Sequence, residues 1–163
     1  DIMSGRDLQI FTTGGEHFVP QSGTNPITPL SLVFKNVSRH GTRPGTKVVS
    51  LESGTVFVQR QGKALNEFLF SDSQLTYITS KISLLSGHLL KAPKRIALRR
   101  ATSTDEGDLL LCVNDTDGSM GVFSIMRSQN VVAPSEYTTT TGKYLDVQVD
   151  ADESPHCLLR ISE

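Results

Sequence analysis

The chain has 163 residues, enough for one ordinary domain that buries roughly 70% of its unfolded surface. Its 16 basic and 17 acidic side chains give a net charge of −1, which excludes a global electrostatic attraction to nucleic acid, anionic membranes or acidic substrates. No stretch approaches the ~20 apolar residues of a membrane span, so we expect a soluble protein with no membrane partner.

Short segments rich in Val, Ile, Phe, Tyr and Thr recur along the whole chain, and each ends at Gly, Pro, Asn or Asp. This pattern is typical of strands separated by turns. It predicts strands near residues 8–13, 16–20, 31–38, 46–51, 55–60, 64–71, 75–79, 95–102, 108–114, 120–127, 131–139, 143–149 and 156–162. The fold class is therefore predicted to be all-β.

Two tight turns indicate how the strands pair. Gln61-Gly62 joins the strands at 55–60 and 64–71, and Asp117-Gly118 joins those at 108–114 and 120–127. Asp-Gly between two apolar runs is a strong hairpin signal. Strands that are neighbours in sequence are therefore predicted to be antiparallel neighbours in space, which gives β-meanders.

Alternation predicts which side chains form the core. In the strand at 55–60, Val56 and Val58 share one face, and Phe68 and Phe70 share a face of the paired strand. We expect these four side chains to be buried and the opposite face of the first strand to be polar or wet. Leu145, Val147 and Val149 alternate in the same way with Asp146 and Gln148.

One short helix is predicted near 80–90. Ile82, Leu85 and Leu89 recur at helical spacing, and Pro93 cannot continue a helix. Residues 20–30, rich in Gly and Pro, are the one long irregular connector. The strands come at about four per ~40–45 residues, a cadence that suits the blades of a β-propeller, although a β-sandwich fits the same pattern.

The two cysteines lie far apart in apolar runs. Cys112 follows Leu109-Leu-Leu, and Cys157 precedes Leu158-Leu159. No second Cys or His stands at metal-ligand spacing from either residue. Both are predicted to be small buried hydrophobes, with neither a disulfide nor a metal.

The segment Gly54–Ser71, followed by Tyr77 and Ile82–Leu89, resembles the most recognisable stretch of the tail nozzle proteins of short-tailed bacteriophages, also called tail tubular B-type proteins. In that family a strand ending in Val-Gln-Arg turns through Gly into a strand ending in Glu-Phe, and a Leu-Leu-x-x-His segment follows. The resemblance extends upstream over Leu8–His17 and downstream over Gly107–Met120 and Gly142–Val147. Two departures stand out, because the family pattern leads one to expect a Trp within 109–113 and an aromatic, His-rich segment near 133–137.

The resemblance implies a fold and a role. It implies that residues 1–163 are a single all-β region, part of a propeller-like body in a longer virion protein, found in the virion tail and in the host cytoplasm before assembly. Copies of such a protein form a ring with neighbouring portal and adaptor proteins, and the genome passes through without specific binding. No catalysis, cofactor or metal is implied. As an excerpt, the chain is expected to leave open strand edges near 8–13 and 156–161, which either pair with each other or mediate self-association.

A competing motif is Arg39-His40-Gly41-Thr42-Arg43, which resembles the signature of histidine acid phosphatases. There the His attacks phosphorus and the arginines bind phosphate oxygens. A second His followed by Asp or Ala-Glu acts as the general acid in that family, whereas the other histidines of this chain precede Phe18, Leu89 and Cys157. We interpret the motif as a turn, and we predict no catalytic, cofactor-binding or metal-binding residues. A phosphatase fragment and a propeller-type protein-interaction module stay as alternatives.

Two charged stretches have ordinary explanations. The basic stretch 91–100 could contact DNA, but Ile96 and Leu98 alternate with polar positions, which favours a strand with a polar outer face. Asp146, Asp150, Asp152 and Glu153 lack the Gly-punctuated spacing of a calcium loop, so an acidic solvated turn is predicted.

Overall fold

The computed structural model describes residues 1–21, 26–52, 54–129 and 131–161. Within them the chain forms antiparallel strands and two short 3₁₀ turns, which confirms the all-β prediction. The strands make four sheets, each built from consecutive strands of the chain. No helix in these ranges is long and apolar enough to cross a membrane.

Sheets 1 and 2 are four-stranded meanders. Sheet 1 contains Ile2–Ser4 (β1), Leu8–Thr12 (β2), Gly15–Val19 (β3) and Lys35–Ser38 (β4). Sheet 2 contains Val49–Leu51 (β5), Gly54–Val58 (β6), Leu65–Ser71 (β7) and Thr76–Lys81 (β8).

Sheet 3 repeats this plan, and sheet 4 has two strands. Sheet 3 contains Pro93–Arg99 (β9), Asp108–Asn114 (β10), Met120–Met126 (β11) and Val131–Tyr137 (β12). Sheet 4 contains Gly142–Val149 (β13) and Pro155–Ile161 (β14). The 3₁₀ turns are Gly87–Leu89 (η1) and Arg127–Gln129 (η2).

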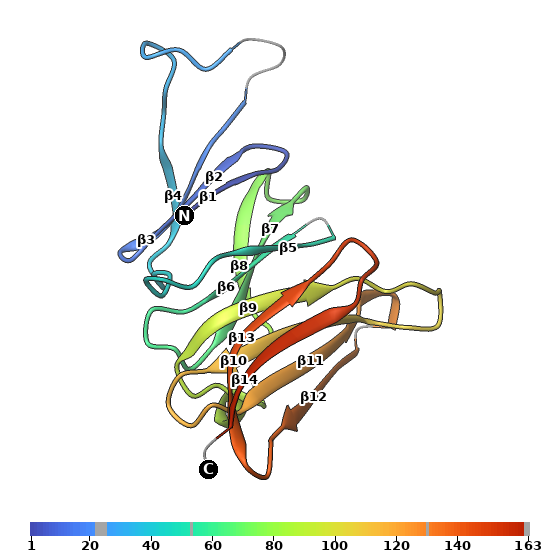
Figure 1. The fold of residues 1–163 in the computed structure, drawn as a ribbon. Helices are drawn as coiled ribbons and strands as arrows, with labels where there is room; N and C mark the ends of the chain where they lie inside the picture. Colours follow the sequence, from blue (N-terminus) through green and yellow to red (C-terminus); the bar gives the residue numbers. More distant parts are fainter. Residues whose placement is uncertain (22–25, 53, 130, 162–163) are drawn as a thin grey trace.

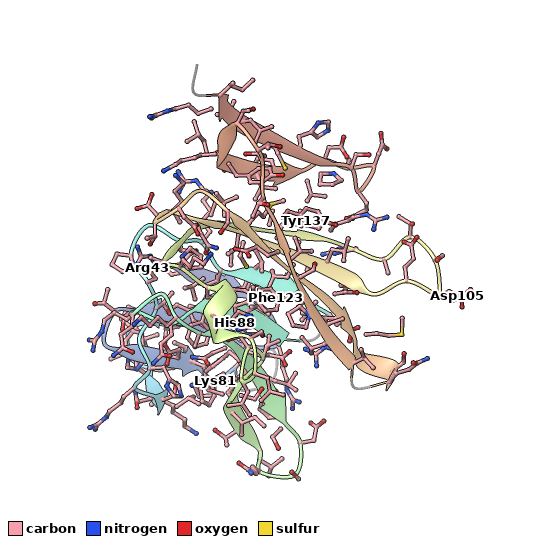
Figure 2. The ribbon with its side chains drawn as sticks, turned by 90° about the horizontal axis from the view of Figure 1, so that it is seen from below. Arg43, Lys81, His88, Asp105, Phe123 and Tyr137 are labelled. Atoms are coloured by element: carbon pink, nitrogen blue, oxygen red, sulfur yellow. The ribbon has the colours of Figure 1, made fainter. Side chains whose placement is uncertain are left out.

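The four sheets stack in chain order, as Figure 1 shows from the blue end of the chain to the red end. An apolar cluster fills each space between neighbours. Aromatic side chains dominate between sheets 1 and 2, whereas aliphatic side chains dominate between sheets 2 and 3 and between sheets 3 and 4. Phe11, Phe57 and Phe68 belong to the first cluster, Val56, Leu110 and Phe123 to the second, and Leu111, Val122 and Val147 to the third. Figure 2 shows Phe123 within the stack and Asp105 far out on the β9–β10 connection.

Sheet 2 is covered on both faces, which corrects one prediction. Val56, Val58 and Phe68 are fully buried as expected, and Phe70 is half-buried. The face of β6 opposite Val56 is not wet, because Phe57 is fully buried there and packs against Phe11 with ring centroids 5.4 Å apart. Alternation assigns side chains to two faces correctly, but only the neighbouring sheet decides whether the second face is dry.

The predicted helix near 80–90 is largely wrong. Residues up to Lys81 continue β8, where they pair with β7, and the one helical element in this stretch is the single 3₁₀ turn η1. Leu85 is 92% exposed, whereas Leu89 is buried. Once β7 holds the first residues in an extended form, too few remain for a stable α-helix. The hydroxyl of buried Ser83 accepts a hydrogen bond from the Leu65 backbone N–H at 2.9 Å, which ties this segment to the first residue of β7.

Both predicted hairpin turns are confirmed. β6 and β7 pair around Gln61-Gly62, and β10 and β11 pair around Asp117-Gly118. Gly62 and Gly118 have φ angles of +70° and +73°, a region that favours glycine. At Gly62 a Cβ atom would also lie 2.8 Å from the Cα of Ala92, so a side chain there would push the β9 entry away.

Several strands also differ from the sequence prediction in their bounds or in their register. β1 was not predicted, β5 begins only at Val49, and β4 begins at Lys35 rather than at residue 31. In β13 a bulge between Tyr144 and Asp146 shifts the register, so Tyr144 and not Leu145 packs with Val147 in the cluster facing sheet 3. A bulge of this kind leaves no trace in an alternating pattern.

The terminal strands do not pair with each other, contrary to one of the two expectations. β2 lies inside sheet 1 between β1 and β3, and β14 belongs to sheet 4. Figure 1 places these sheets at opposite ends of the stack. Closure of the chain on itself through its end strands is therefore excluded in this structure.

The β3–β4 connection projects from sheet 1 (Figure 1). Its described part, residues 26–34, is here called the arm. A turn shapes it, because the Ser31 N–H donates to the Thr28 carbonyl oxygen at 3.0 Å. Its apolar side chains face solvent, with exposed fractions of 43% for Ile27, 101% for Leu30, 39% for Leu32, 55% for Val33 and 58% for Phe34.

Candidate functional site

The first strands of the later sheets lie side by side on one edge of the stack, here called the first-strand edge. β5 contacts β9, and β9 contacts β13. Sheets 1 and 2 meet at the same edge, where the Val48 N–H donates to an Asp1 carboxylate oxygen at 3.1 Å. The fourth strands β4 and β8 contact each other instead. The strands of successive sheets are thus ordered the same way, from first to fourth.

A cleft of about 610 Å³ runs along the first-strand edge. Strands β5, β9 and β13 line it together with the residues just before β5. Its charged side chains are Lys47, Arg95 and Asp146, and the Arg95 Nε lies 3.5 Å from Asp146 Oδ1. These two side chains are 50% and 37% exposed, so their ion pair stabilises the fold by less than ~1 kcal/mol.

A second cleft of about 350 Å³ adjoins the first and shares Gly45 and Lys47 with it. Residues 42–46 line it, together with Asp1 and the residues 11–13. The Thr46 hydroxyl donates to the Pro93 carbonyl oxygen at 3.0 Å, which ties this segment to sheet 3. Together the two clefts give the first-strand edge a mixed polar and apolar lining with charges of both signs.

The Arg39–Arg43 motif lies in the connection between sheets 1 and 2, where Thr42 forms an isolated β-bridge with Gln59. The Thr42 N–H donates to the Thr12 carbonyl oxygen at 2.8 Å, and the Arg60 N–H donates to the Gly41 carbonyl oxygen at 2.8 Å. Gly41 has φ +71°, and a Cβ atom there would overlap the Thr13 carbonyl. The glycine of the motif is therefore explained by close packing of two backbones.

The histidine of this motif is exposed. No hydrogen bond or ion pair joins His40 to another residue within the described ranges. His17 lies on β3, His88 on η1 and His156 on β14, where its Nε2 is 3.0 Å from Asp150 Oδ2. The structure does not bring any of these groups together with His40 as a phosphatase site requires.

The basic stretch 91–100 contains a strand, as predicted, although β9 runs from Pro93 to Arg99 and not over 95–102; most of the cations are paired with carboxylates. Lys94 Nζ lies 3.3 Å from Asp115 Oδ1, and an Arg99 Nη lies 3.3 Å from Glu106 Oε2. Ile96 and Leu98 face sheet 2, whereas Ala97 faces sheet 4. Because acidic partners already occupy these side chains, the stretch offers little free positive charge to DNA.

Lys91 joins three segments at the far end of sheet 3. Its Nζ lies 2.7 Å from Asp117 Oδ2 and 2.8 Å from Glu136 Oε1. Partial burial acts to raise the pKa of Asp117, but hydrogen bonds from Lys91 and Ser119 outweigh it and lower that pKa to about 2. The same contacts raise the pKa of Lys91 and lower that of Glu136. This cluster fixes β12 to the β10–β11 turn.

The acidic residues after β13 form a turn. Asp150 Oδ1 accepts hydrogen bonds from the Asp152 N–H at 3.0 Å and the Ser154 N–H at 2.9 Å. Its hydrogen bond with His156 lowers the pKa of Asp150. Within the described part of the chain, no group of three His, Cys, Asp or Glu side chains is placed to hold a metal ion.

The two cysteines differ. Cys112 is fully buried as predicted, and burial raises the pKa of its thiol. Cys157 is exposed on β14, so the prediction of a buried hydrophobe was wrong there. Its apolar neighbours Leu158 and Leu159 are exposed with it, because no described strand covers the outer edge of β14.

A comparison of the chain with protein-family models and with curated proteins finds no match. The first-strand edge was not predicted as a surface, whereas residues 20–30, whose described end belongs to the arm, were predicted to be an irregular connector. The one sequence feature that could have indicated the arm is the uncharged run Leu30–Phe34, which follows two prolines and precedes β4. The same run is equally typical of a buried strand, so it does not predict exposure.

Proposed function

We propose that this chain is an arc of a propeller-like body in the tail nozzle of a short-tailed bacteriophage or prophage, with virion assembly and genome passage as its role and no catalysis. One structural observation carries the proposal together with the sequence resemblance. Three consecutive four-stranded meanders and a fourth, two-stranded one stack face to face, with their first strands along one edge. Propeller blades are four-stranded sheets arranged in this way around an axis.

The surface chemistry supports a passive channel wall. The first-strand edge, which lies nearest the axis of such a body, carries Lys47, Arg95 and Asp146, and the last two are paired with each other. A wall with charges of both signs does not attract the DNA phosphates strongly, since non-specific affinity depends on the number of free cations. Genome passage needs such a wall.

The partners that this role implies are other copies of the protein and the neighbouring tail and portal-adaptor proteins. The arm supports such contacts, because it projects from sheet 1 (Figure 1) and its uncharged, apolar side chains are exposed. Contiguous exposed apolar surface marks interaction sites. The same observation favours a second candidate, a propeller-type interaction module outside any virion.

Localisation in the virion tests the proposal. Antibodies raised against residues 1–163 should label the tail end of phage particles induced from the strain that encodes the chain, as seen by immunogold electron microscopy. Antibodies against the capsid of the same particles serve as the control. Labelled protein in the host lysate but none on purified particles would favour the interaction module over the nozzle.

Catalysis is tested separately with a generic aryl phosphate between mildly acidic and neutral pH. We expect no turnover by the parent chain and no change in the His40→Ala variant, because His40 lies exposed in the connection between sheets 1 and 2, without a hydrogen-bonded general acid. Turnover by the parent that disappears in His40→Ala would overturn the non-catalytic role. Turnover that persists in the variant would indicate a contaminating phosphatase.

A further inference from the structure

Two groups of cations differ in how their charge is compensated. Those at the start of sheet 3 are held by carboxylates, as Lys91, Lys94 and Arg99 show. Residues 39–45 and 59–64, here called the basic surface, carry four cations and no Asp or Glu. None of the four forms an ion pair with a described residue. They are Arg39, Arg43, Arg60 and Lys63.

The two segments of the basic surface are packed together. The Arg43 N–H donates to the Val58 carbonyl oxygen at 2.9 Å, just before the second segment begins. A Cβ atom at Gly62 would lie 3.0 Å from an Arg43 Nη. The Arg43 guanidinium therefore lies over the glycine of the β6–β7 turn, and Lys63 is the next residue of that turn. Cations from two separate parts of the chain thus share one surface.

Arg39 and Arg60 lie beside the link between β2 and β3. An Arg60 Nη donates to the Thr13 carbonyl oxygen at 3.3 Å, and a Cβ atom at Gly15 would lie 3.5 Å from the Arg39 Cα. This link contains no Asp or Glu either. Figure 2 shows Arg43 on the opposite side of the stack from Asp105. The basic surface is therefore formed at the end of sheets 1 and 2 that lies away from the β9–β10 connection.

Carboxylates on neighbouring segments are engaged elsewhere. Glu16 is fully buried, and hydroxyl groups donate to it. An Asp1 carboxylate oxygen accepts from the Val48 N–H, and Asp115 is paired with Lys94. The positive charge of the basic surface is thus not compensated by described side chains, although the whole chain has a net charge of −1.

The chemistry of this surface favours a nucleic acid over a protein partner. Arg39, Arg60 and Lys63 are exposed, and Arg43 is half-buried. None of the large apolar side chains that are exposed in the described ranges belongs to residues 39–45 or 59–64. The centre of a protein–protein interface is depleted of charge and enriched in aromatic side chains. Interfaces with nucleic acids are more polar and much more positively charged.

We propose that the basic surface binds the phosphate backbone of a nucleic acid without regard to base sequence. Three of its four cations are arginines, whose planar guanidinium groups bind phosphate oxygens through two parallel hydrogen bonds. The first-strand edge differs, because its Arg95 is paired with Asp146. The inference rests on the unpaired cations of these two segments and not on the virion role, so each can fail while the other stands.

The probe is a fluorescein-labelled DNA duplex of about 20 base pairs and mixed sequence, titrated with the 163-residue chain and followed by fluorescence anisotropy. We expect a Kd on the order of 10 μM at ~50 mM salt. If each cation contacts one phosphate, log K should fall against log salt with a slope of about −3 to −4. A second duplex of unrelated sequence should bind within about twofold, since phosphate contacts carry no sequence information.

Matched double variants locate the site. Arg39→Gln with Lys63→Gln should weaken binding at least ~10-fold at low salt and make the salt slope shallower by about 2. Arg100→Gln with Lys143→Gln removes the same two residue types on sheets 3 and 4, where both are exposed and neither forms an ion pair with a described residue. This control should change Kd by less than about twofold. Circular dichroism checks that both variants are folded.

Three results would overturn the proposal. The first is no binding at ~50 mM salt with the chain at millimolar concentration. The second is equal weakening by the two double variants, which would assign the binding to charge spread over the whole chain. The third is a labelled decaglutamate peptide that binds at least as tightly as the duplex, which would make the partner an acidic protein segment.

Discussion

Sheets 2 and 4 have the same kind of sequence and different surroundings. β6 of sheet 2 is buried on both faces, with Val56 toward sheet 3 and Phe57 toward sheet 1. In sheet 4, Val147 of β13 is buried toward sheet 3, whereas β14 is exposed along its whole length. The difference teaches that position in the stack, and not strand composition, sets how much each apolar side chain contributes to stability. The following predictions test this from the largest expected effect to the smallest.

The largest expected effect is the difference in lost stability when each of two phenylalanines of β7 is replaced by alanine. Phe68 is fully buried and stacks on Tyr77 with ring centroids 4.6 Å apart, whereas Phe70 is half-buried. Phe68→Ala should cost about 3–5 kcal/mol of unfolding free energy, and Phe70→Ala about half as much or less. Urea unfolding followed by circular dichroism measures both. Equal losses would show that the outer end of β7 is as enclosed as its middle.

A matched leucine pair compares the second strands directly. Leu110 of β10 is fully buried, and Leu158 of β14 is 59% exposed. Leu110→Ala should cost about 2–5 kcal/mol, whereas Leu158→Ala should cost less than about 1 kcal/mol. Thermal unfolding of the two variants at the same concentration checks this. A large loss for Leu158→Ala would mean that β14 is already covered in solution.

The Lys91 cluster predicts that the stability of the fold falls at low pH. The pKa of Asp117 is about 2 in the folded chain, against an ordinary value of 3.8, so its stabilising effect is complete above pH ~4 and is lost as the pH falls toward 2. Its side chain is 38% exposed, and solvent screening keeps the contribution under ~1 kcal/mol. Asp117→Asn should lower stability at pH 7 and reduce its slope below pH 4. An unchanged slope in a pH series of urea unfolding curves would contradict this assignment.

The smallest effect is expected at the outer contact between sheets 1 and 2. Arg6 lies 3.1 Å from Asp72 Oδ1, and its guanidinium carbon is 3.8 Å from the centroid of the Phe70 ring. Both charged side chains are largely exposed, so Arg6→Ala should cost about 0.5–1 kcal/mol, mostly through the cation–π contact. Asp72→Ala is the control and should cost less. A larger loss for Asp72→Ala would assign the effect to the ion pair.

Much of the fold could be predicted from the sequence because local signals determine it. β10 has the bounds that were predicted for it, and the Gly62 and Gly118 turns place β6 beside β7 and β10 beside β11. Period-two alternation and turn residues act within a few positions of each other. The same reasoning placed Gly41 in a connection between two strands and predicted a strand in the basic stretch 91–100, without invoking catalysis or DNA binding.

The candidate surfaces could not be predicted in the same way. The first-strand edge joins β5, β9 and β13, which lie about forty to fifty residues apart along the chain, and no local pattern records that they meet. The arm and β14 are as apolar as buried strands, so composition alone does not show that their side chains are exposed. Their exposure follows from what packs beside them.

The sequence by itself thus determined the strands, their antiparallel pairing with chain neighbours and the two-faced character of each sheet, since these depend on backbone preferences and side-chain alternation. Only the tertiary structure decided which faces are dry, and that Lys81 ends a strand and does not lie in a helix. Burial is a property of two packed surfaces, and a strand's own residues specify only one of them.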